Sequence, residues 1–341
     1  MKKTKAVKTP TDSATYIAEI VGEESLFGQR MSAGKLLHMM DVAAGHSAAK
    51  HAECPLVTLA FDRVELLNFI YHMDYVHYDA YVIKVGRSSI VVNVEGYTKQ
   101  PTQMEIQPAH SGVITMVAID KNKRPCRNIP ALEYRTSEDL EKKKMAQERE
   151  RILKQRRQEI AQIDSLKQIR SSRLKDFYKR KYYYTPAESE LKIRKVFLPR
   201  NANSLGIIFG GDTIEMMEEL ALASARQFTG NFGMVTIAME DVLFMKPLNV
   251  DNLVEMDAKV IFVANTTLAV EITVRAIDYI APYKSHVTNK GVFTVLNYDR
   301  AGKKTAIASG LDMSRASLAE KRSYLKEQIK YENRFLKRSS R

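Results

Sequence analysis

The sequence contains little cysteine and no long apolar stretch. Its two cysteines, Cys54 and Cys126, are too few for a disulfide framework or a cysteine-based zinc site, so we expect two reduced thiols. No run of about 18 apolar residues is present, which argues against a membrane span. The basic start of the chain is not followed by an apolar stretch, so a secretory signal is not expected. Together these absences favour a cytoplasmic protein.

The composition that is present is that of a globular protein. The 341 residues are 45% hydrophobic and 27% charged, which suits two domains of ordinary size. A net charge of +13 would suggest nucleic-acid binding if it covered a folded face. Instead, residues 138–181 carry +7 and residues 314–341 carry +6, which leaves the rest of the chain neutral. We therefore do not expect nucleic acid to be a partner.

The chain contains a long internal repeat. Residues 34–41 return as 211–218 at an offset of 177, and residues 57–64 return as 235–242 at an offset of 178. This period is too long for a solenoid, so the repeat predicts two copies of one domain. Fused copies can pack like a homodimer around a pseudo-twofold axis. Two further segments return in the same order: 85–89 as 263–267 and 112–115 as 291–294.

Each copy has the pattern of one long helix followed by strands. The helices start after the small-residue turns at 32–34 and 210–211 and carry an apolar face. Stretches rich in Val, Ile and Thr follow each helix. The pattern predicts an α+β fold in which a helix packs on an antiparallel sheet. The predicted strands cover residues 57–64, 76–85, 90–97 and 112–119 in the first copy, and 235–242, 253–263, 268–277 and 291–296 in the second.

Two basic segments lie outside the copies. Residues 138–181 have no Gly or Pro and are rich in Glu, Lys, Arg and Gln, which favours a solvated helix, and a second amphipathic helix is expected over 315–338. Both helices either lie on the surface and bridge the copies or form arms that bind a partner or a polyanion. The predicted boundaries are 15–133 for the first domain, 134–189 for the helical linker, 190–312 for the second domain and 313–341 for the C-terminal helix.

Two positions suggest chemistry. Asp41 lies in an apolar helical stretch, where an acid is more often a solvated edge residue, but the repeat places an acid, Glu218, at the matching position. Asn203 comes seven residues before Gly210, where Asn is normally a turn or capping residue. A Gly-Gly helix entry also lets a substrate approach backbone N–H groups, which can stabilise the oxyanion of acyl transfer.

The segments around these positions resemble the hotdog-fold acyl-CoA thioesterases, and most closely the tandem, double-hotdog acyl-CoA hydrolases. Residues 199–211 of the second copy carry the stronger signature. The likeness covers both copies. The other matching segments are 216–219, 235–239 and 244–247 in the second copy and 40–41, 57–58 and 85–89 in the first.

The resemblance implies one site at the interface of two hotdogs. One copy would contribute Asn203 and the Gly210 N–H group, which faces the thioester oxygen. The other would contribute the carboxylate of Asp41 and, seventeen residues later, Thr58. The resemblance also implies contacts with the CoA part of the substrate, although Arg87 is as readily an ordinary surface arginine. The implied substrate-binding residues are Arg87, Ser88 and Gly211.

The matching second site departs from the family pattern. Glu218 and Thr236 would face Leu26, which stands near the place of Asn203, so this site lacks its amide. The resemblance implies hydrolysis of fatty acyl-CoA to fatty acid and CoA, with no cofactor and no metal, by a homo-oligomer such as a trimer of double hotdogs. The alternatives are a non-catalytic acyl-CoA-binding scaffold and a hotdog dehydratase, which would need a histidine and a carboxylate that converge on the site.

Overall fold

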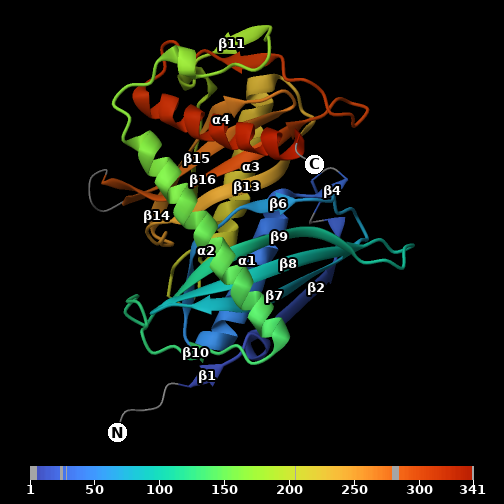
Figure 1. The fold of residues 1–341 in the computed structure, drawn as a ribbon, viewed down its shortest axis with the longest axis vertical. Coiled ribbons are helices and arrows are strands. Elements are labelled where there is room, and N and C mark those ends of the chain that lie inside the picture. Colours follow the sequence, from blue (N-terminus) through green and yellow to red (C-terminus); the bar gives the residue numbers. More distant parts are fainter. Residues whose placement is uncertain (1–5, 24–25, 28, 204, 279–283, 340–341) are drawn as a thin grey trace.

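Two long helices, α1 (Ala33–Ala52) and α3 (Gly210–Thr229), pack against each other and against one antiparallel sheet in this computed structural model (Figure 1). Helix α1 begins where the sequence predicts because Ser32 caps it and accepts a hydrogen bond from the backbone N–H of Lys35 at 3.1 Å. The prediction of an α+β protein built from two tandem copies of one helix-on-sheet domain is confirmed. The structure describes residues 6–23, 26–27, 29–203, 205–278 and 284–339.

The main sheet has eleven strands and runs through both copies without a break. Strands β5 and β13 join the two halves, where Phe61 pairs with Val242 and Ala60 pairs with Leu243. The path follows the order β12-β14-β15-β16-β13-β5-β9-β8-β7-β2, and β6 pairs with β13 and β9. Its strands are β2 (Thr15–Ile20), β5 (Leu56–Phe61), β6 (Val64–Leu66), β7 (Tyr75–Val85), β8 (Ser89–Lys99), β9 (Gln107–Ala118), β12 (Leu191–Val196), β13 (Met234–Phe244), β14 (Asn252–Val263), β15 (Thr267–Asp278) and β16 (Ser285–Asn297).

Short two-stranded pairs complete the fold. Strand β1 (Val7–Lys8) runs parallel to β10 (Ala131–Leu132), and β11 (Tyr182–Tyr184) runs parallel to β17 (Ser309–Leu311). Strand β3 (Leu26–Phe27) is antiparallel to β4 (Arg30–Met31).

The strand predictions missed both edges of the main sheet. Strand β2 exposes Tyr16 and Ile20, so its sequence shows no alternation of apolar and polar residues. Strand β12 does alternate Leu and Ile with Lys and Arg, and this signal could have been read. The strand predicted over 57–64 is two strands, because the chain leaves β5 at Asp62 and resumes as β6.

The basic linker forms helix α2 (Ser137–Asp164), which bridges the two copies along the outside of the sheet (Figure 1). Arg149 donates two hydrogen bonds to Asp62 of the first copy, at 2.5 and 3.1 Å. Near the other end, Asp164 lies 2.8 Å from Lys326 in the C-terminal helix. The structure therefore shows α2 as a bridge between the two copies. Some of its charged side chains form ion pairs with other parts of the same chain.

The helix predicted over 138–181 is too long, since α2 ends at Asp164. The chain then turns back onto the second copy, where Leu174 and Phe177 pack against the core. Arg180 is 9% exposed and donates hydrogen bonds to the carbonyl oxygens of Ile307 at 2.7 Å and Ala264 at 2.9 Å. Tertiary contacts of this kind outweigh the modest helix preference of Lys, Arg and Gln.

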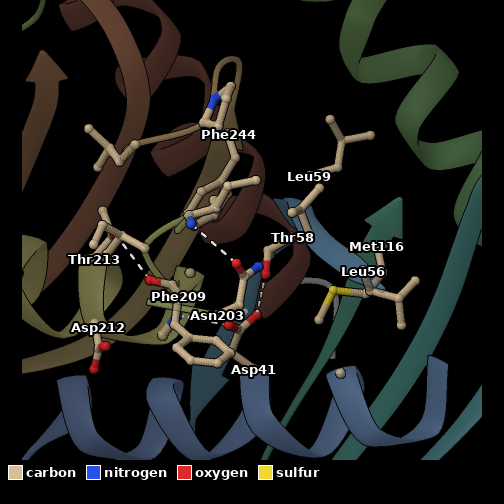
Figure 2. A pocket seen from close by; sticks show the side chains of 18 of the residues that line it. Asp41, Leu56, Thr58, Leu59, Met116, Asn203, Phe209, Asp212, Thr213 and Phe244 are labelled. Carbon is tan, nitrogen blue, oxygen red and sulfur yellow. Dashed lines mark hydrogen bonds between the residues drawn. The ribbon is translucent and has the colours of Figure 1, made fainter. Parts of the chain in front are cut away.

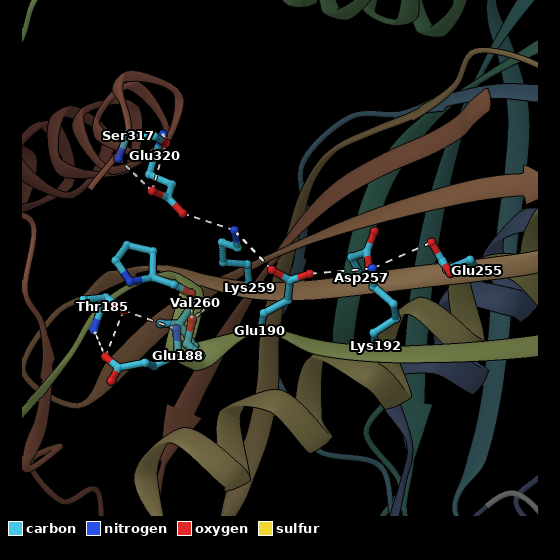
Figure 3. Close-up of polar contacts among 12 residues, drawn as sticks. Thr185, Glu188, Glu190, Lys192, Glu255, Asp257, Lys259, Val260, Ser317 and Glu320 are labelled. Carbon is cyan, nitrogen blue, oxygen red and sulfur yellow. Dashed lines mark hydrogen bonds and ion pairs between the residues drawn. The ribbon is translucent and has the colours of Figure 1, made fainter. Parts of the chain in front are cut away.

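The amphipathic helix expected over 315–338 is present as α4 (Leu318–Ser339), which lies across the second copy and buries Tyr324 and Leu325 (Figure 1). Ion pairs also connect it to the sheet (Figure 3). Lys259 of β14 lies 3.1 Å from Glu320 of α4 and 3.5 Å from Glu190, which precedes β12. Partly exposed pairs of this kind each add little stability, so the apolar contacts of Tyr324 and Leu325 contribute most to the position of α4.

The two cysteines are neighbours in the fold, which their spacing did not reveal. Both thiols are free and partly buried. Burial and the adjacent thiol of Cys126 together raise the pKa of Cys54 to about 11. The thiol of Cys54 is therefore protonated at neutral pH.

Each long helix crosses its sheet over a glycine. A methyl group on Gly112 of β9 would lie 2.7 Å from Val64 and 2.9 Å from Met40, and one on Gly291 of β16 would lie 2.5 Å from Val242. These two glycines are equivalent in the repeat, at an offset of 179. Close approach of helix and sheet therefore depends on them in both copies.

We expect Gly112→Ala and Gly291→Ala each to lower the free energy of unfolding by about 1–3 kcal/mol, because the core must move to admit the methyl group. Denaturant melts of the full chain measure this. Gly45→Ala in α1 is the control, because its nearest neighbour would be 3.8 Å away, and we expect it to be neutral or slightly stabilising. Equal effects of all three substitutions would contradict the packing argument.

Candidate active site

The carboxylate of Asp41 lies at the contact between the two copies. Its Oδ1 accepts a hydrogen bond from the hydroxyl of Thr58 at 2.8 Å, and its Oδ2 accepts one from the backbone N–H of Gly211 at 2.8 Å. Thr58 follows on β5 of the same copy, whereas Gly211 belongs to the first turn of α3 in the other copy. Helix α3 has no side-chain cap of its own, so Asp41 supplies that acceptor across the interface.

Asp41 is buried, with 5% of its surface exposed. Burial raises the pKa of this carboxyl to about 6, against the hydrogen bonds from Thr58 and Gly211 and the charge of His38, which lower it. The group is therefore ionised at neutral pH and more basic than an ordinary aspartate. Such a carboxylate suits proton transfer near pH 7.

Asn203 and Gly210 of the second copy face this carboxylate, and Figure 2 shows Asn203 beside Thr58 and Asp41. The amide oxygen of Asn203 accepts hydrogen bonds from the backbone N–H groups of Leu205 at 2.9 Å and Ile207 at 3.1 Å. Because the turn uses the oxygen, the NH2 group remains for the cavity. The four catalytic residues expected from the sequence, Asp41, Thr58, Asn203 and Gly210, therefore lie around one cavity.

Gly210 is the first residue of α3, and its N–H group is not needed by the hydrogen bonds of the helix. A side chain here would collide with the site: an added Cβ would lie 2.6 Å from Thr58 Oγ1 and 3.0 Å from Asp41 Oδ2. The absence of a side chain thus lets another molecule approach the helix N-terminus and the carboxylate at once.

A cavity of about 770 Å³ opens beside these groups, and both copies line it. Three cations lie in its wall: Lys123 of the first copy and Arg200 and Lys246 of the second. The sequence analysis did not single them out because they come from three separate segments, although Arg200 and Lys246 lie within the matched segments 199–211 and 244–247. The apolar part of the wall includes Val42, Leu56, Leu59, Met116, Ile119, Phe209 and Phe244, several of which Figure 2 shows.

The second carboxylate has similar partners but almost no cavity. Glu218 is 1% exposed and accepts a hydrogen bond from the hydroxyl of Thr236 at 2.5 Å. Burial raises the pKa of Glu218 to about 7, against the hydroxyl of Thr236 and the backbone N–H of Gly34, which lower it. The adjoining cavity measures only about 60 Å³, and Arg30 stacks over the ring of Phe69 in its wall.

Three groups in the described part of the chain have metal-ligand atoms within 4.8 Å of one another: His38, Asp212 and Glu215. His38 pairs with both acids, its Nδ1 lying 3.4 Å from Asp212 Oδ1 and from Glu215 Oε2. Mutual pairing accounts for this arrangement, so we assign no ion to it.

Comparison with known proteins identifies the family. The model of the thioesterase superfamily matches residues 28–105 and 205–280, one region in each copy. Over 110 residues, the chain is 39% identical to an uncharacterized acyl-CoA thioester hydrolase of Zymomonas mobilis, covering 32% of this chain and 74% of that protein. The chain belongs to the thioesterase superfamily.

Other thioesterase-family relatives agree. An uncharacterized acyl-CoA thioester hydrolase of Bacillus subtilis is 32% identical over 139 residues, covering 41% of this chain and 76% of that protein. The solved acyl-CoA hydrolase from Bacillus cereus is 27% identical and aligns with 48% of this chain and 100% of that chain, at a TM-score of 0.43. The family model and the two sequence relatives confirm the assignment to the hotdog thioesterases and to hydrolases as an enzyme class. Among the described residues, no helix is long and apolar enough to cross a membrane.

Three residues that the thioesterase resemblance assigned to the substrate lie elsewhere or have another partner. Arg87 and Ser88 lie in the turn between β7 and β8 and are not part of the cavity wall. Gly211 does line the cavity, but its N–H group donates to Asp41. It therefore holds the carboxylate in place. Leu26 lies in β3, and its side chain is outside the described part of the structure.

Proposed function

We propose that the chain hydrolyses fatty acyl-CoA thioesters to a free fatty acid and CoA at one composite site between its two hotdog domains. The observation that carries this proposal is the hydrogen bond from Gly211 of the second copy to Asp41 of the first, beside the larger cavity. This hydrogen bond brings together a carboxylate that can act as the base and a helix N-terminus that can stabilise the oxyanion. Thioester hydrolysis uses both groups.

In the proposed mechanism, the N–H group of Gly210 donates to the thioester oxygen and stabilises the negative charge that develops there. Asp41 removes a proton from water as the water attacks the carbonyl carbon. Direct attack by Asp41, which gives a mixed anhydride that water then hydrolyses, uses the same atoms. Asn203 orients the water or the substrate through its NH2 group, and Thr58 holds the carboxylate. The tetrahedral intermediate then expels the CoA thiolate, which takes up the proton that Asp41 received from the water.

The cavity wall suits such a substrate. Its apolar side chains can enclose an acyl chain, and the cations Lys123, Arg200 and Lys246 can bind the phosphates of CoA. Lys123 is already held in place, because its Nζ donates to Asn249 Oδ1 of the other copy at 2.9 Å. We propose that no cofactor takes part, since the chain supplies both the base and the oxyanion donor. A trimer of double hotdogs remains a prediction.

Release of CoA tests the proposal. The purified chain is incubated with acyl-CoAs from acetyl to palmitoyl, and the free thiol is detected with a thiol reagent. We expect turnover, with longer chains favoured by the apolar wall. Binding of acyl-CoA without release of CoA would instead support the scaffold alternative, and release of water from a hydroxyacyl-CoA would support a dehydratase.

The pH dependence follows from the state of Asp41. Since the base must be ionised and its pKa is about 6, kcat/KM should be level above about pH 7 and fall about tenfold per unit well below pH 6. The same assay between pH 4.5 and 8.5 measures this on the wild-type chain, whose folding is checked at each pH. A midpoint near pH 4 would mean that the carboxylate is solvated during turnover and would contradict the buried site.

A further inference from the structure

His38 and Glu215 occupy the same position in the two copies. The offset of 177 that relates Gly34 to Gly211 also relates His38 to Glu215. The same offset relates Lys35 to Asp212. At two equivalent positions, the first copy therefore has cationic side chains and the second copy has acids.

These equivalent residues meet each other where α1 and α3 cross. A Cβ on Gly34 would lie 3.1 Å from the Cα of Glu215, and a Cβ on Gly211 would lie 3.1 Å from the ring of His38. Two glycines thus allow the helices to come close. The contact places His38 Nδ1 3.4 Å from both Glu215 Oε2 and Asp212 Oδ1.

The charges make this contact asymmetric. If two first copies paired around the same axis, His38 would face His38, with Lys35 close by. If two second copies paired, Glu215 would face Glu215, with Asp212 close by. Like charges in these positions would repel, whereas the pairing of unlike copies joins opposite charges. The contact therefore favours the arrangement that brings Asp41 to the N-terminus of α3.

His38 also connects this contact to the carboxylate. It lies one turn before Asp41 on α1 and lines the same cavity. The neighbouring carboxylate of Glu215 and the charge of Asp212 raise the pKa of His38, while burial and Lys35 lower it. The net shift is upward, so the ring retains its proton to higher pH than a free histidine. The charge of His38 in turn lowers the pKa of Asp41 against the effect of burial, while Asp212 raises it.

We propose that His38 is a positioning residue with two effects. Paired with Glu215 and Asp212, it holds the N-terminal turn of α3 against α1, and its positive charge keeps Asp41 ionised in a buried site. This inference rests on the proposed role of Asp41 as the base. In this inference, the cluster of His38, Asp212 and Glu215 controls the ionisation of Asp41.

The first test is His38→Gln in the full chain. Loss of the charge should move the acid limb of the kcat/KM profile up by about 0.5 to 1 pH unit, the size expected for one nearby charge in a partly hydrated site. At pH 5 this is a loss of about three- to tenfold, whereas activity at pH 8 should remain within about twofold of the wild type. A purely structural role would lower activity evenly across the profile and leave the midpoint in place.

Thermal melts test the contact itself. Because the pKa of His38 is raised in the folded state, the pair stabilises most below the ordinary value of 6.5, and this stability is lost as the pH rises through the folded pKa. The difference in Tm between wild type and His38→Gln should therefore be larger at pH 6 than at pH 9. A constant difference would overturn the ion-pair argument.

A charge swap separates the two effects. His38→Glu alone should lower Tm by repulsion from Glu215, and adding Glu215→His should restore most of the Tm. The swap should still leave the acid limb shifted upward, because a negative charge then lies beside Asp41. If His38→Gln does not fold, the same comparison between the swap and the wild type decides the question.

The outcomes also distinguish this inference from the proposed function. If Asp41→Asn abolishes turnover but neither His38→Gln nor the swap moves the acid limb, His38 has no role in ionising Asp41 and only this inference is wrong. If Asp41→Asn remains active, the proposed function of the site is wrong, whatever His38 does.

Discussion

Asp41→Asn is expected to lower kcat by at least ~10²-fold, the usual contribution of a positioned acid–base group. Glu218→Gln, at the equivalent position, is expected to leave kcat within about threefold, because its cavity of about 60 Å³ cannot admit an acyl-CoA. Steady-state CoA release by the two variants measures the difference. The comparison is well matched, since both carboxylates are buried and each is bonded to a threonine hydroxyl.

Folding must be compared in parallel. Asp41 accepts two hydrogen bonds, and an amide can accept only on its oxygen, so one of the donors from Thr58 and Gly211 loses its acceptor. A circular dichroism melt identifies any loss of folded protein. Equal losses of kcat in the two folded variants would mean that both sites work and that the composite site is not unique.

Gly210→Ala is expected to lower kcat by roughly 10²-fold. The new methyl group would lie 2.6 Å from Thr58 Oγ1 and 3.0 Å from Asp41 Oδ2, so helix and carboxylate must separate. A displacement near one ångström moves the oxyanion donor away from the thioester oxygen. Burst and steady-state measurements of CoA release show whether the chemical step is the one that slows.

The chain contains its own control for this substitution. At an offset of 177, Ala33 stands where Gly210 stands in the other copy, so the closed site already has alanine at its helix entry. Ala33→Gly should leave activity unchanged, because opening one position does not enlarge the small cavity. Retention of more than about a third of kcat by Gly210→Ala would show that its N–H group is not the oxyanion donor.

The sequence predicted the core of the fold and the centre of the site because the repeat gave an internal comparison. An acid in a helix is ambiguous when alone, but Asp41 matched Glu218, and both helix entries carried glycine. The same comparison predicted that the second site is incomplete, because Leu26 stands in the first copy near the position equivalent to Asn203. Local patterns therefore sufficed wherever each copy could be checked against the other.

Features that depend on tertiary contacts were missed. The linker contains good helix formers up to Lys181, yet burial of Phe177 and Arg180 ends the helix at Asp164. The phosphate-binding role expected for Arg87 stays a prediction, whereas the cations that line the cavity come from segments far apart in the chain. No single segment carries the information that Lys123 and Lys246 face one cavity.

The shared sheet has a consequence for synthesis. Strand β5 pairs with β13, so the edge at Ala60 stays open until the ribosome has made Leu243. At roughly 5–20 residues per second, this takes on the order of ten seconds after the first domain is complete. During that time an unpaired strand edge and the apolar flank of α1 are exposed to other nascent chains. The yield of correctly folded protein therefore depends on how quickly translation of the second half follows the first.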